Sequence, residues 1–233
     1  MRILVTRPKD DAEATAAKLS ALGHTALIAP MLEIRYRAGP ETALERVQAI
    51  LATSSNGVYA LARRTPRRDV PLFAVGSQTA NAAKSVGFKT VKSADGDAAA
   101  LAKATAEWAN PSAGVLVHAA GADTKGDLAG TLMSRGFDVR VDVLYEAVAS
   151  VELPPVAREA LEAGAIDGVL FFSPRSANAF SQCVVKAGLV DRNRKLVAYC
   201  VSKATADALS PLKFRDVRIA PHPDQDALLA LIA

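Results

Sequence analysis

Small hydroxyl side chains recur in the middle and in the last third of the chain, and they are the residues best suited to holding an anion. In both places they stand between an apolar, β-rich segment and a helical segment. Each one alone is explained as well by helix capping, but a helix N-terminus also binds carboxylates and phosphates. The candidate ligand-binding residues are Ser54, Ser55, Ser77, Thr79, Ser173, Ser176, Ser202 and Thr205. Their recurrence predicts two sets of turns that cradle an anion with several separated carboxylates or phosphates.

Tyr145 differs from its neighbours because it stands near the end of a long extended segment, Phe137 to Ser150. A tyrosine on a linker between two domains would face the cleft between them. Packing of the ring against the hinge accounts for the position equally well.

Metal and nucleotide signatures are missing from the sequence. His24, His118 and His222 have no second histidine or cysteine three or four residues away, as the usual zinc motifs on a helix have. No Gly-x-Gly-x-x-Gly follows the first predicted strand, and no Gly-x-Ser-x-Gly is present. We therefore expect a protein without metal, flavin or nicotinamide.

The chain contains a duplication. Residues 72–91 and 196–219 share one order: an apolar segment, a small polar turn, Thr-Ala opening a helix, and a second β-rich segment. A shorter strand, helix and strand also occurs twice, with Gly23 and Gly136 stopping the two helices. The two kinds of block alternate, which predicts parallel sheets covered by helices on both faces.

Two divisions into domains fit this alternation: a tandem cut near Asn110, or a middle domain inserted into one made of both ends. Residues 25–37 and 137–150 each read as extended for about a dozen residues, whereas strands average 5 to 6. Such long strands suit a crossing between domains. We therefore predict a first domain of residues 1–37 and 149–233, and an inserted domain of residues 38–148.

The composition is that of a folded protein, with 50% hydrophobic and 22% charged residues. No apolar run reaches the roughly 18 residues of a membrane span, and the first residues contain no signal-peptide core. Cys183 and Cys200 lack a disulfide framework spacing, and Cys200 is read as a buried apolar residue. We expect a cytoplasmic monomer that does not contact membranes.

Nucleic-acid binding is disfavoured. The net charge is +4, but Lys and Arg are scattered and aromatic residues make up only 5%. The arginines between Arg63 and Arg68 form a cluster that we assign to a helix end.

Several short motifs, in this order and spacing, resemble the uroporphyrinogen-III synthase family over nearly the whole chain. They are Val5-Thr-Arg-Pro8, Pro30, Thr53-Ser-Ser-Asn-Gly-Val58, Val75-Gly-Ser-Gln-Thr-Ala80, Val143-Leu-Tyr145, Phe171-Phe-Ser-Pro174 and Thr205-Ala206. The chain departs from the family at Val201-Ser202, where a glycine is common, and at Ala52, where an aromatic is common.

The resemblance implies an α/β fold of two parallel-sheet, flavodoxin-like three-layer domains joined by a two-stranded linker. It also implies an enzyme that needs no cofactor and cyclises hydroxymethylbilane with loss of water and inversion of the terminal pyrrole. Tyr145 is then the candidate proton donor to the leaving hydroxyl, since a phenol can donate near pH 7. The hydroxyl-rich turns, with Thr79 and Thr205, are then the candidates to hold the carboxylate arms of the substrate.

Two other functions stay open at the level of sequence. A two-domain ligand sensor of periplasmic-binding-protein-like architecture has the same paired α/β domains, although this chain contains no DNA-binding module. A noncatalytic member of the synthase family, acting as a scaffold, is the third possibility.

Overall fold

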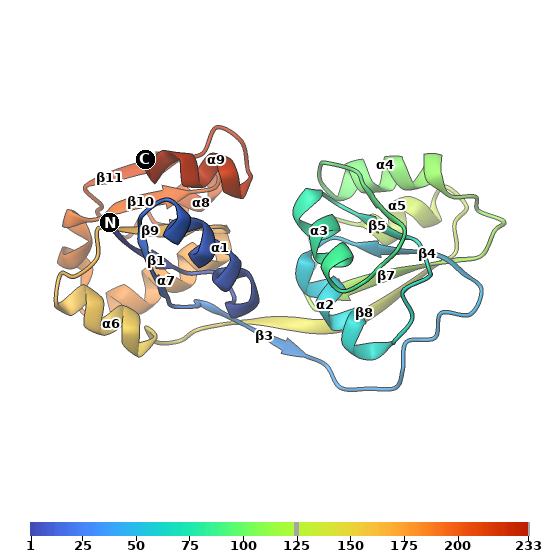
Figure 1. Cartoon of the computed structure of the whole chain (residues 1–233), viewed down its shortest axis with the longest axis horizontal. Coiled ribbons are helices and arrows are strands. Elements are labelled where there is room, and N and C mark those ends of the chain that lie inside the picture. The colour runs from blue at the N-terminus through green and yellow to red at the C-terminus, as the bar shows by residue number, and fades with distance from the viewer. Residues whose placement is uncertain (124–125, 233) are drawn as a thin grey trace. The chain divides into compact units, whose positions relative to one another are not determined.

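Strands and helices alternate along the chain, and they assemble into two units (Figure 1). The computed structural model describes residues 1–123 and 126–232. Within these residues, one unit contains Met1–Glu33 and the chain from Val148 onward, and the other is Ile34–Ala147. Each unit has its own sheet and its own core.

The first unit is built on a five-stranded sheet in the order β11-β10-β9-β1-β2, counted over the described residues. All the pairings within it are parallel. Its elements are β1 (Arg2–Val5), α1 (Lys9–Ala21), β2 (Thr25–Ile28), α6 (Pro155–Glu162), β9 (Gly168–Phe171), α7 (Pro174–Lys186), η1 (Val190–Lys195), β10 (Val197–Cys200), α8 (Lys203–Asp207), β11 (Asp216–Ile219), α9 (Gln225–Leu229) and η2 (Ala230–Ile232).

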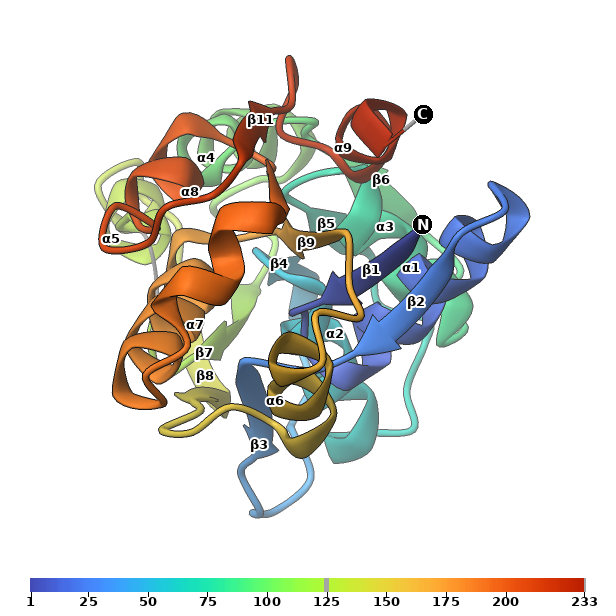
Figure 2. The same ribbon diagram turned by 90° about the vertical axis from the view of Figure 1, so that its left-hand side faces the viewer.

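Helices cover both faces of this sheet because its central strands are apolar on both sides. Every residue of β9 and β10 is buried, as expected for the middle of a parallel sheet. One core cluster packs α6, α7 and the residues after α8 against the sheet. Another packs α1 and α9 on the opposite face. Figure 2 looks onto this unit and shows α6 and α7 on one side of the strands and α1 on the other.

The second unit has a six-stranded sheet in the order β3-β8-β7-β4-β5-β6, again counted over the described part of the chain. Its elements are β3 (Leu32–Tyr36), β4 (Val47–Ala52), α2 (Ser55–Arg64), β5 (Leu72–Ala74), α3 (Ser77–Ser85), β6 (Val91–Ser93), α4 (Ala98–Trp108), β7 (Val115–Gly121), α5 (Leu128–Met133) and β8 (Val139–Ala149). Helices α2 and α3 cover one face, and α4 and α5 cover the other. Three layers are therefore present in each unit, which confirms the predicted fold class.

The predicted duplication is confirmed by strand pairing. The longer repeat is β5-α3-β6 and β10-α8-β11, and both copies pair their two strands in parallel. The block β4-β5-β6 lies beside β7-β8 in one sheet, as β9-β10-β11 lies beside β1-β2 in the other. The two sheets thus have the same arrangement of blocks, but the shorter block comes first along the chain in the first unit and last in the second. If the strands of the first sheet are renumbered 1 to 5 along the chain, their order across the sheet is 2-1-3-4-5, the flavodoxin order. Strands β4 to β8, renumbered in the same way, have the order 3-2-1-4-5.

The long extended segments connect the two units. Within residues 137–150, predicted as extended, Val139–Ala149 form the single strand β8, and the unit boundary falls within it. Residues 25–37, predicted as one strand, are instead β2 and β3, which belong to different sheets. The break occurs at Pro30, which has no N–H to donate to a strand ladder. The neighbouring Ala29 and Met31 N–H groups still bond to Val5 and Thr6 carbonyls, so the chain stays extended there.

The helical turn begins earlier than predicted in both copies of the longer repeat. Ser77 and Lys203 belong to the small polar turns that the sequence predicts just before Thr-Ala in the two copies, but they are the first residues of α3 and α8. The hydroxyl residues there therefore lie in or next to the first helical turn, where helices begin with Ser or Gly as N-cap.

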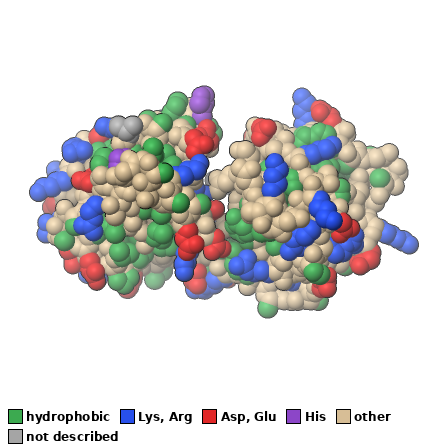
Figure 3. Space-filling model, in the orientation of Figure 1, with side chains coloured by type: hydrophobic (Ala, Val, Ile, Leu, Met, Phe, Trp, Pro, Cys, Tyr) green, Lys and Arg blue, Asp and Glu red, His purple; other side chains and the backbone are tan. Residues whose placement is uncertain are grey.

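The arginine cluster at the end of α2 binds backbone carbonyls, which agrees with its assignment to a helix end. Arg68 donates to the carbonyls of Ala62 and Thr65, and Arg64 donates to that of Pro40. On the face in Figure 3, basic and acidic side chains are interspersed over both units. Among the described helices, none has the length and apolar character that a bilayer crossing needs.

Candidate active site

The order of strands places a topological switch point in each sheet, where ligands of doubly wound proteins bind beyond the carboxyl ends of strands. In the first unit it lies between β1 and β9, and in the second between β4 and β7. The residues after β4, β5, β9 and β10 are those predicted to bind an anion, and each of these turns leads into a helix.

Ser54 is the N-cap of α2 at the switch point of the second unit. Its backbone is extended, and its Oγ accepts a hydrogen bond from the N–H of Gly57 at 3.1 Å. Ser55 is the first residue of α2 and is 6% exposed. The helix packs closely on the sheet, since a methyl group at Gly57 would collide with the carbonyl oxygen of Ala119 in β7.

Tyr145 lies in β8 beside this turn. Its ring covers Gly121, which it faces across the ladder: a Cβ at Gly121 would lie 2.7 Å from Cζ of the ring. Its phenol Oη is 2.7 Å from Oγ of Ser54. Burial raises the pKa of Tyr145 above its ordinary value; the hydrogen bond with Ser54 lowers it, and the negative charge of Asp123 raises it. The half-buried phenol is therefore neutral at pH 7 and able to donate a proton.

The turn after β5 has a different cap. Gly76 is the N-cap of α3 and supplies no side chain, while Ser77 is exposed at the first position of the helix. Thr79, at the third position, is 4% exposed. Ser77 is thus open to a ligand, and Thr79 faces the interior.

The two turns of the first unit repeat one hydroxyl pair. Ser173 caps α7 by accepting from the N–H of Ser176, and the two Oγ atoms are 3.0 Å apart. Ser202 caps α8 by accepting from the N–H of Thr205, and their hydroxyl oxygens are also 3.0 Å apart. Ser176 and Thr205 are buried, whereas Ser173 and Ser202 are half-buried. The turns follow neighbouring strands, since β9 pairs with β10.

The structure thus joins Tyr145 to Ser54 directly, and it pairs hydroxyls within each turn of the first unit. As whole residues Thr79 and Thr205 are 4% and 0% exposed, so a ligand at these turns meets the capping residues and the backbone N–H groups first. The predicted roles of all these residues stay predictions.

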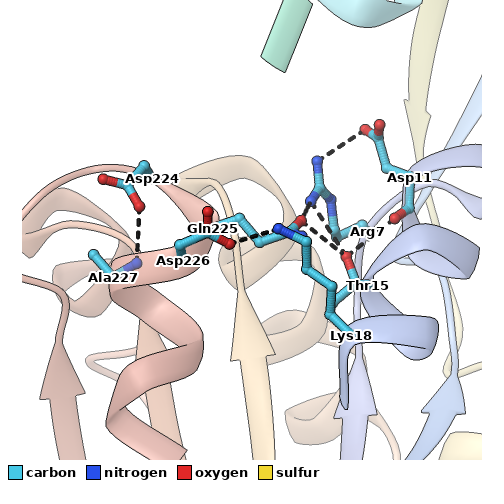
Figure 4. Close-up of polar contacts among 8 residues, drawn as sticks. All are labelled: Arg7, Asp11, Thr15, Lys18, Asp224, Gln225, Asp226 and Ala227. Atoms are coloured by element: carbon cyan, nitrogen blue, oxygen red, sulfur yellow. Dashed lines mark hydrogen bonds and ion pairs between the residues drawn. The ribbon is translucent and has the colours of Figure 1, made fainter. Parts of the chain in front are cut away.

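Sequence reasoning missed Arg7, which follows β1 at the switch point of the first unit (Figure 4). This residue is 5% exposed, and its guanidinium stacks 4.2 Å from the ring centroid of Phe172. It pairs with Asp11 at 3.2 Å and donates to Gln225 Oε1 at 2.6 Å. Arg7 therefore ties the turn before α1 to α9; an arginine two residues after an apolar strand was the available signal.

His118 is the titratable group of β7 nearest the switch point of the second unit. It is 4% exposed, and its Nε2 lies 3.4 Å from Oγ1 of Thr53. Burial lowers the pKa of His118, so it is neutral at pH 7. Over residues 1–123 and 126–232, no three His, Cys, Asp or Glu side chains gather as a metal site would require.

An apolar cavity of about 560 Å³ lies elsewhere in the first unit, lined by the end of α1, by α9 and by His24. His24 precedes β2, so this cavity is at the amino ends of the strands. It does not coincide with the hydroxyl-rich turns.

Two doubly wound α/β units, with capped helices at the switch points and a phenol beside one of them, define an α/β protein whose turns lie where doubly wound folds bind ligands. The chain belongs to the uroporphyrinogen-III synthase family, whose sequence model matches residues 13–230. This is a family of tetrapyrrole-biosynthesis enzymes.

Solved structures support the fold. The uroporphyrinogen-III synthetase of Helicobacter pylori is 18% identical, with a TM-score of 0.62 over 100% of this chain and 98% of the other. A mutant uroporphyrinogen III synthase of the extremely thermophilic bacterium Thermus thermophilus is 20% identical, with a TM-score of 0.53 over 100% and 97% of the two chains. No curated protein matches the chain by sequence.

Proposed function

We propose that this protein is a uroporphyrinogen-III synthase: a lyase that cyclises hydroxymethylbilane, removes its hydroxyl as water and inverts the terminal pyrrole. The observation that carries the mechanism is the neutral phenol of Tyr145, held by Ser54 at the switch point of a chain of this family.

The substrate suits the turns because it is a linear tetrapyrrole with acetate and propionate arms. Backbone N–H groups and hydroxyls at helix N-termini stabilise carboxylates by about 0.3 to 1 kcal/mol each when exposed, and up to about 2 when partly buried. Apart from Ser54, whose hydroxyl is engaged by Tyr145, the proposed binding residues are Ser55, Ser77, Thr79, Ser173, Ser202 and Thr205. Binding spread over many weak contacts holds a flexible polyanion without any one residue being decisive.

Tyr145 supplies the proton in the first chemical step. The C–O bond of the hydroxymethyl group breaks, the oxygen leaves with the phenol proton as water, and a cationic azafulvene remains. The substituted carbon of the last ring attacks this cation to form a spiro intermediate, which fragments and closes through the other α-carbon. That carbon loses its hydrogen as the macrocycle forms, which returns one proton to the phenolate.

Orientation of the bound substrate must supply most of the remaining rate enhancement and the choice of product isomer, because the free bilane closes without inversion. Holding reacting groups in a productive geometry can contribute about 7 to 11 kcal/mol. The product isomer therefore reports directly on the protein.

Incubation with freshly prepared hydroxymethylbilane, followed by oxidation and isomer analysis, tests the proposal. We expect the inverted isomer to dominate with the protein and the uninverted isomer to dominate without it. A ligand sensor or a noncatalytic scaffold predicts the uninverted isomer in both samples.

We further propose that the protein is a monomer in the cytoplasm. Both cysteines are buried and unpaired, which supports a reducing compartment. Analytical ultracentrifugation at micromolar concentration tests the oligomeric state; a stable dimer contradicts it.

A further inference from the structure

Ser54 differs from the other capping serines in the partner of its hydroxyl. Ser173 and Ser202 each contact a hydroxyl three residues later in the same helix. Gly57 stands at that position in α2, so no hydroxyl of α2 takes this place. Instead, the Ser54 hydroxyl contacts the phenol of Tyr145, which lies in β8.

The hydrogen-bonding capacity of Ser54 explains what this contact does. A serine hydroxyl donates one hydrogen and accepts two. The N–H of Gly57 occupies one acceptor position of Oγ. If Ser54 donates its hydrogen to the phenol oxygen, the hydrogen of the phenol is left to point at a ligand.

Two glycines hold the pair together. Gly57 allows α2 to touch the carbonyl of Ala119 in β7, which sets the position of Ser54. Gly121 allows the ring of Tyr145 to lie directly on β7. Ser54 and Tyr145 are therefore both positioned by packing against β7, and neither can move away from the other without disturbing that packing.

We propose that Ser54 is a positioning residue for Tyr145 and does not hold a carboxylate arm. Its hydroxyl donates a hydrogen bond to the phenol oxygen, so that the phenol proton faces the departing hydroxyl of the substrate. This inference rests on the proposed function. During C–O cleavage the phenol proton passes to the leaving oxygen, and the resulting phenolate still accepts the hydrogen bond from the Ser54 hydroxyl, which keeps its own proton. The N–H of Gly57, at the positive end of α2, polarises that hydrogen further.

A double-mutant cycle tests the coupling. We expect Ser54→Ala to lower kcat about tenfold to a hundredfold, as for a hydrogen bond to a charged group, with little change in KM. In the Tyr145→Phe background the same change should lower kcat less than about twofold, because residues acting as one unit are not additive. Ser54→Thr, which keeps a hydroxyl and a cap, should restore most of kcat. An equal loss in both backgrounds, or a loss confined to KM, overturns the inference.

A titration without substrate separates this inference from the proposed function. The chain has 4 tyrosines, so the ultraviolet difference between wild type and Tyr145→Phe isolates the ionisation of Tyr145. Since the hydrogen bond with Ser54 lowers the pKa of Tyr145, Ser54→Ala should raise it. An unchanged titration contradicts the contact, whatever the protein does to hydroxymethylbilane.

Ser173→Ala is the matched control, because its cap on α7 has the same geometry but no tyrosine. It should destabilise the protein about as much as Ser54→Ala and leave the Tyr145 titration unchanged. If wild type forms no inverted isomer, the proposed function fails, while the titration still decides the contact.

Discussion

At the scale of single residues, the environment of each titratable group decides what it can do. Arg7 is permanently charged, paired with Asp11 and internal, so it cannot release a proton. His118 is neutral but 4% exposed, and the described contact of its Nε2 is Thr53. Tyr145 combines a transferable proton with partial exposure. It is therefore the residue of the second switch point best placed for general acid catalysis.

Tyr145→Phe should lower the rate of inverted-isomer formation by about 10² to 10⁴-fold, the usual contribution of a general acid. Thr79→Ala and Ser173→Ala should each cost tenfold or less, because each carboxylate contact at a helix end is weak. The three variants are compared in the isomer assay, with circular dichroism to confirm folding. If Tyr145→Phe keeps nearly full activity, Tyr145 only packs the hinge, and its catalytic role must be withdrawn.

Cys200 should make the stability of the protein depend on alkaline pH. Burial in β10 raises the pKa of its thiol from 9.0 to about 12. Between these values the unfolded chain loses the thiol proton and the folded protein keeps it, so the free energy of unfolding falls as pH rises.

The stabilising effect of Cys200 relative to alanine should therefore shrink by about 1 kcal/mol between pH 8 and pH 10. Urea unfolding of wild type and Cys200→Ala at both values measures this change. Val197→Ala, in the same strand, has no titratable group and should cost the same at both pH values. A constant difference between wild type and Cys200→Ala argues against a thiolate excluded by burial.

At the scale of elements, the close approach of α2 to β7 depends on Gly57. Alanine normally stabilises a helix by about 0.5 to 1 kcal/mol relative to glycine. Here the added methyl group meets the carbonyl oxygen of Ala119, so Gly57→Ala should lower the free energy of unfolding by about 1 to 3 kcal/mol.

Gly76→Ala, at the N-cap of α3, provides the control, because a methyl group at Gly76 meets nothing within 4 Å. Its effect should stay within the cost of a changed N-cap, a few tenths of a kcal/mol to about 1. Equal urea midpoints for the two variants would show that α2 moves freely on the sheet.

The repeat made most of the fold predictable from sequence, since a strand, turn and helix in the same order twice constrains pairing as well as secondary structure. The contact between Tyr145 and Ser54 was not predictable. It depends on the register of β8 against β7, which shifts between Ala120 and Gly121, and a sequence pattern does not specify such a shift. The proline itself signals the break at Pro30 in the sequence. Because the backbone around it stays extended, the sequence pattern does not show that β2 and β3 belong to different sheets.

At the scale of the whole chain, the alternation of blocks explains why the first unit is discontinuous. Its short block, β1-α1-β2, comes at the start, and its long block, β9 to β11, comes at the end. The second unit takes both of its blocks from the middle. Chain order alone therefore places one complete set of strands inside the other, with β3 and β8 as the two connections.

The middle of the chain should consequently fold by itself, which tests the predicted inserted domain of residues 38–148. Residues 32–149, chosen to keep β3 and β8 whole, retain all the strands of the second sheet that the structure describes. Residues 1–110, the tandem alternative, keep β1 without β9 and β4 without β7. Both central strands would then expose apolar faces and unpaired edges, which favours aggregation over folding. We expect a single cooperative urea transition for 32–149 and none for 1–110. Cooperative unfolding of 1–110, with 32–149 unstructured by circular dichroism, would show that the chain divides in tandem.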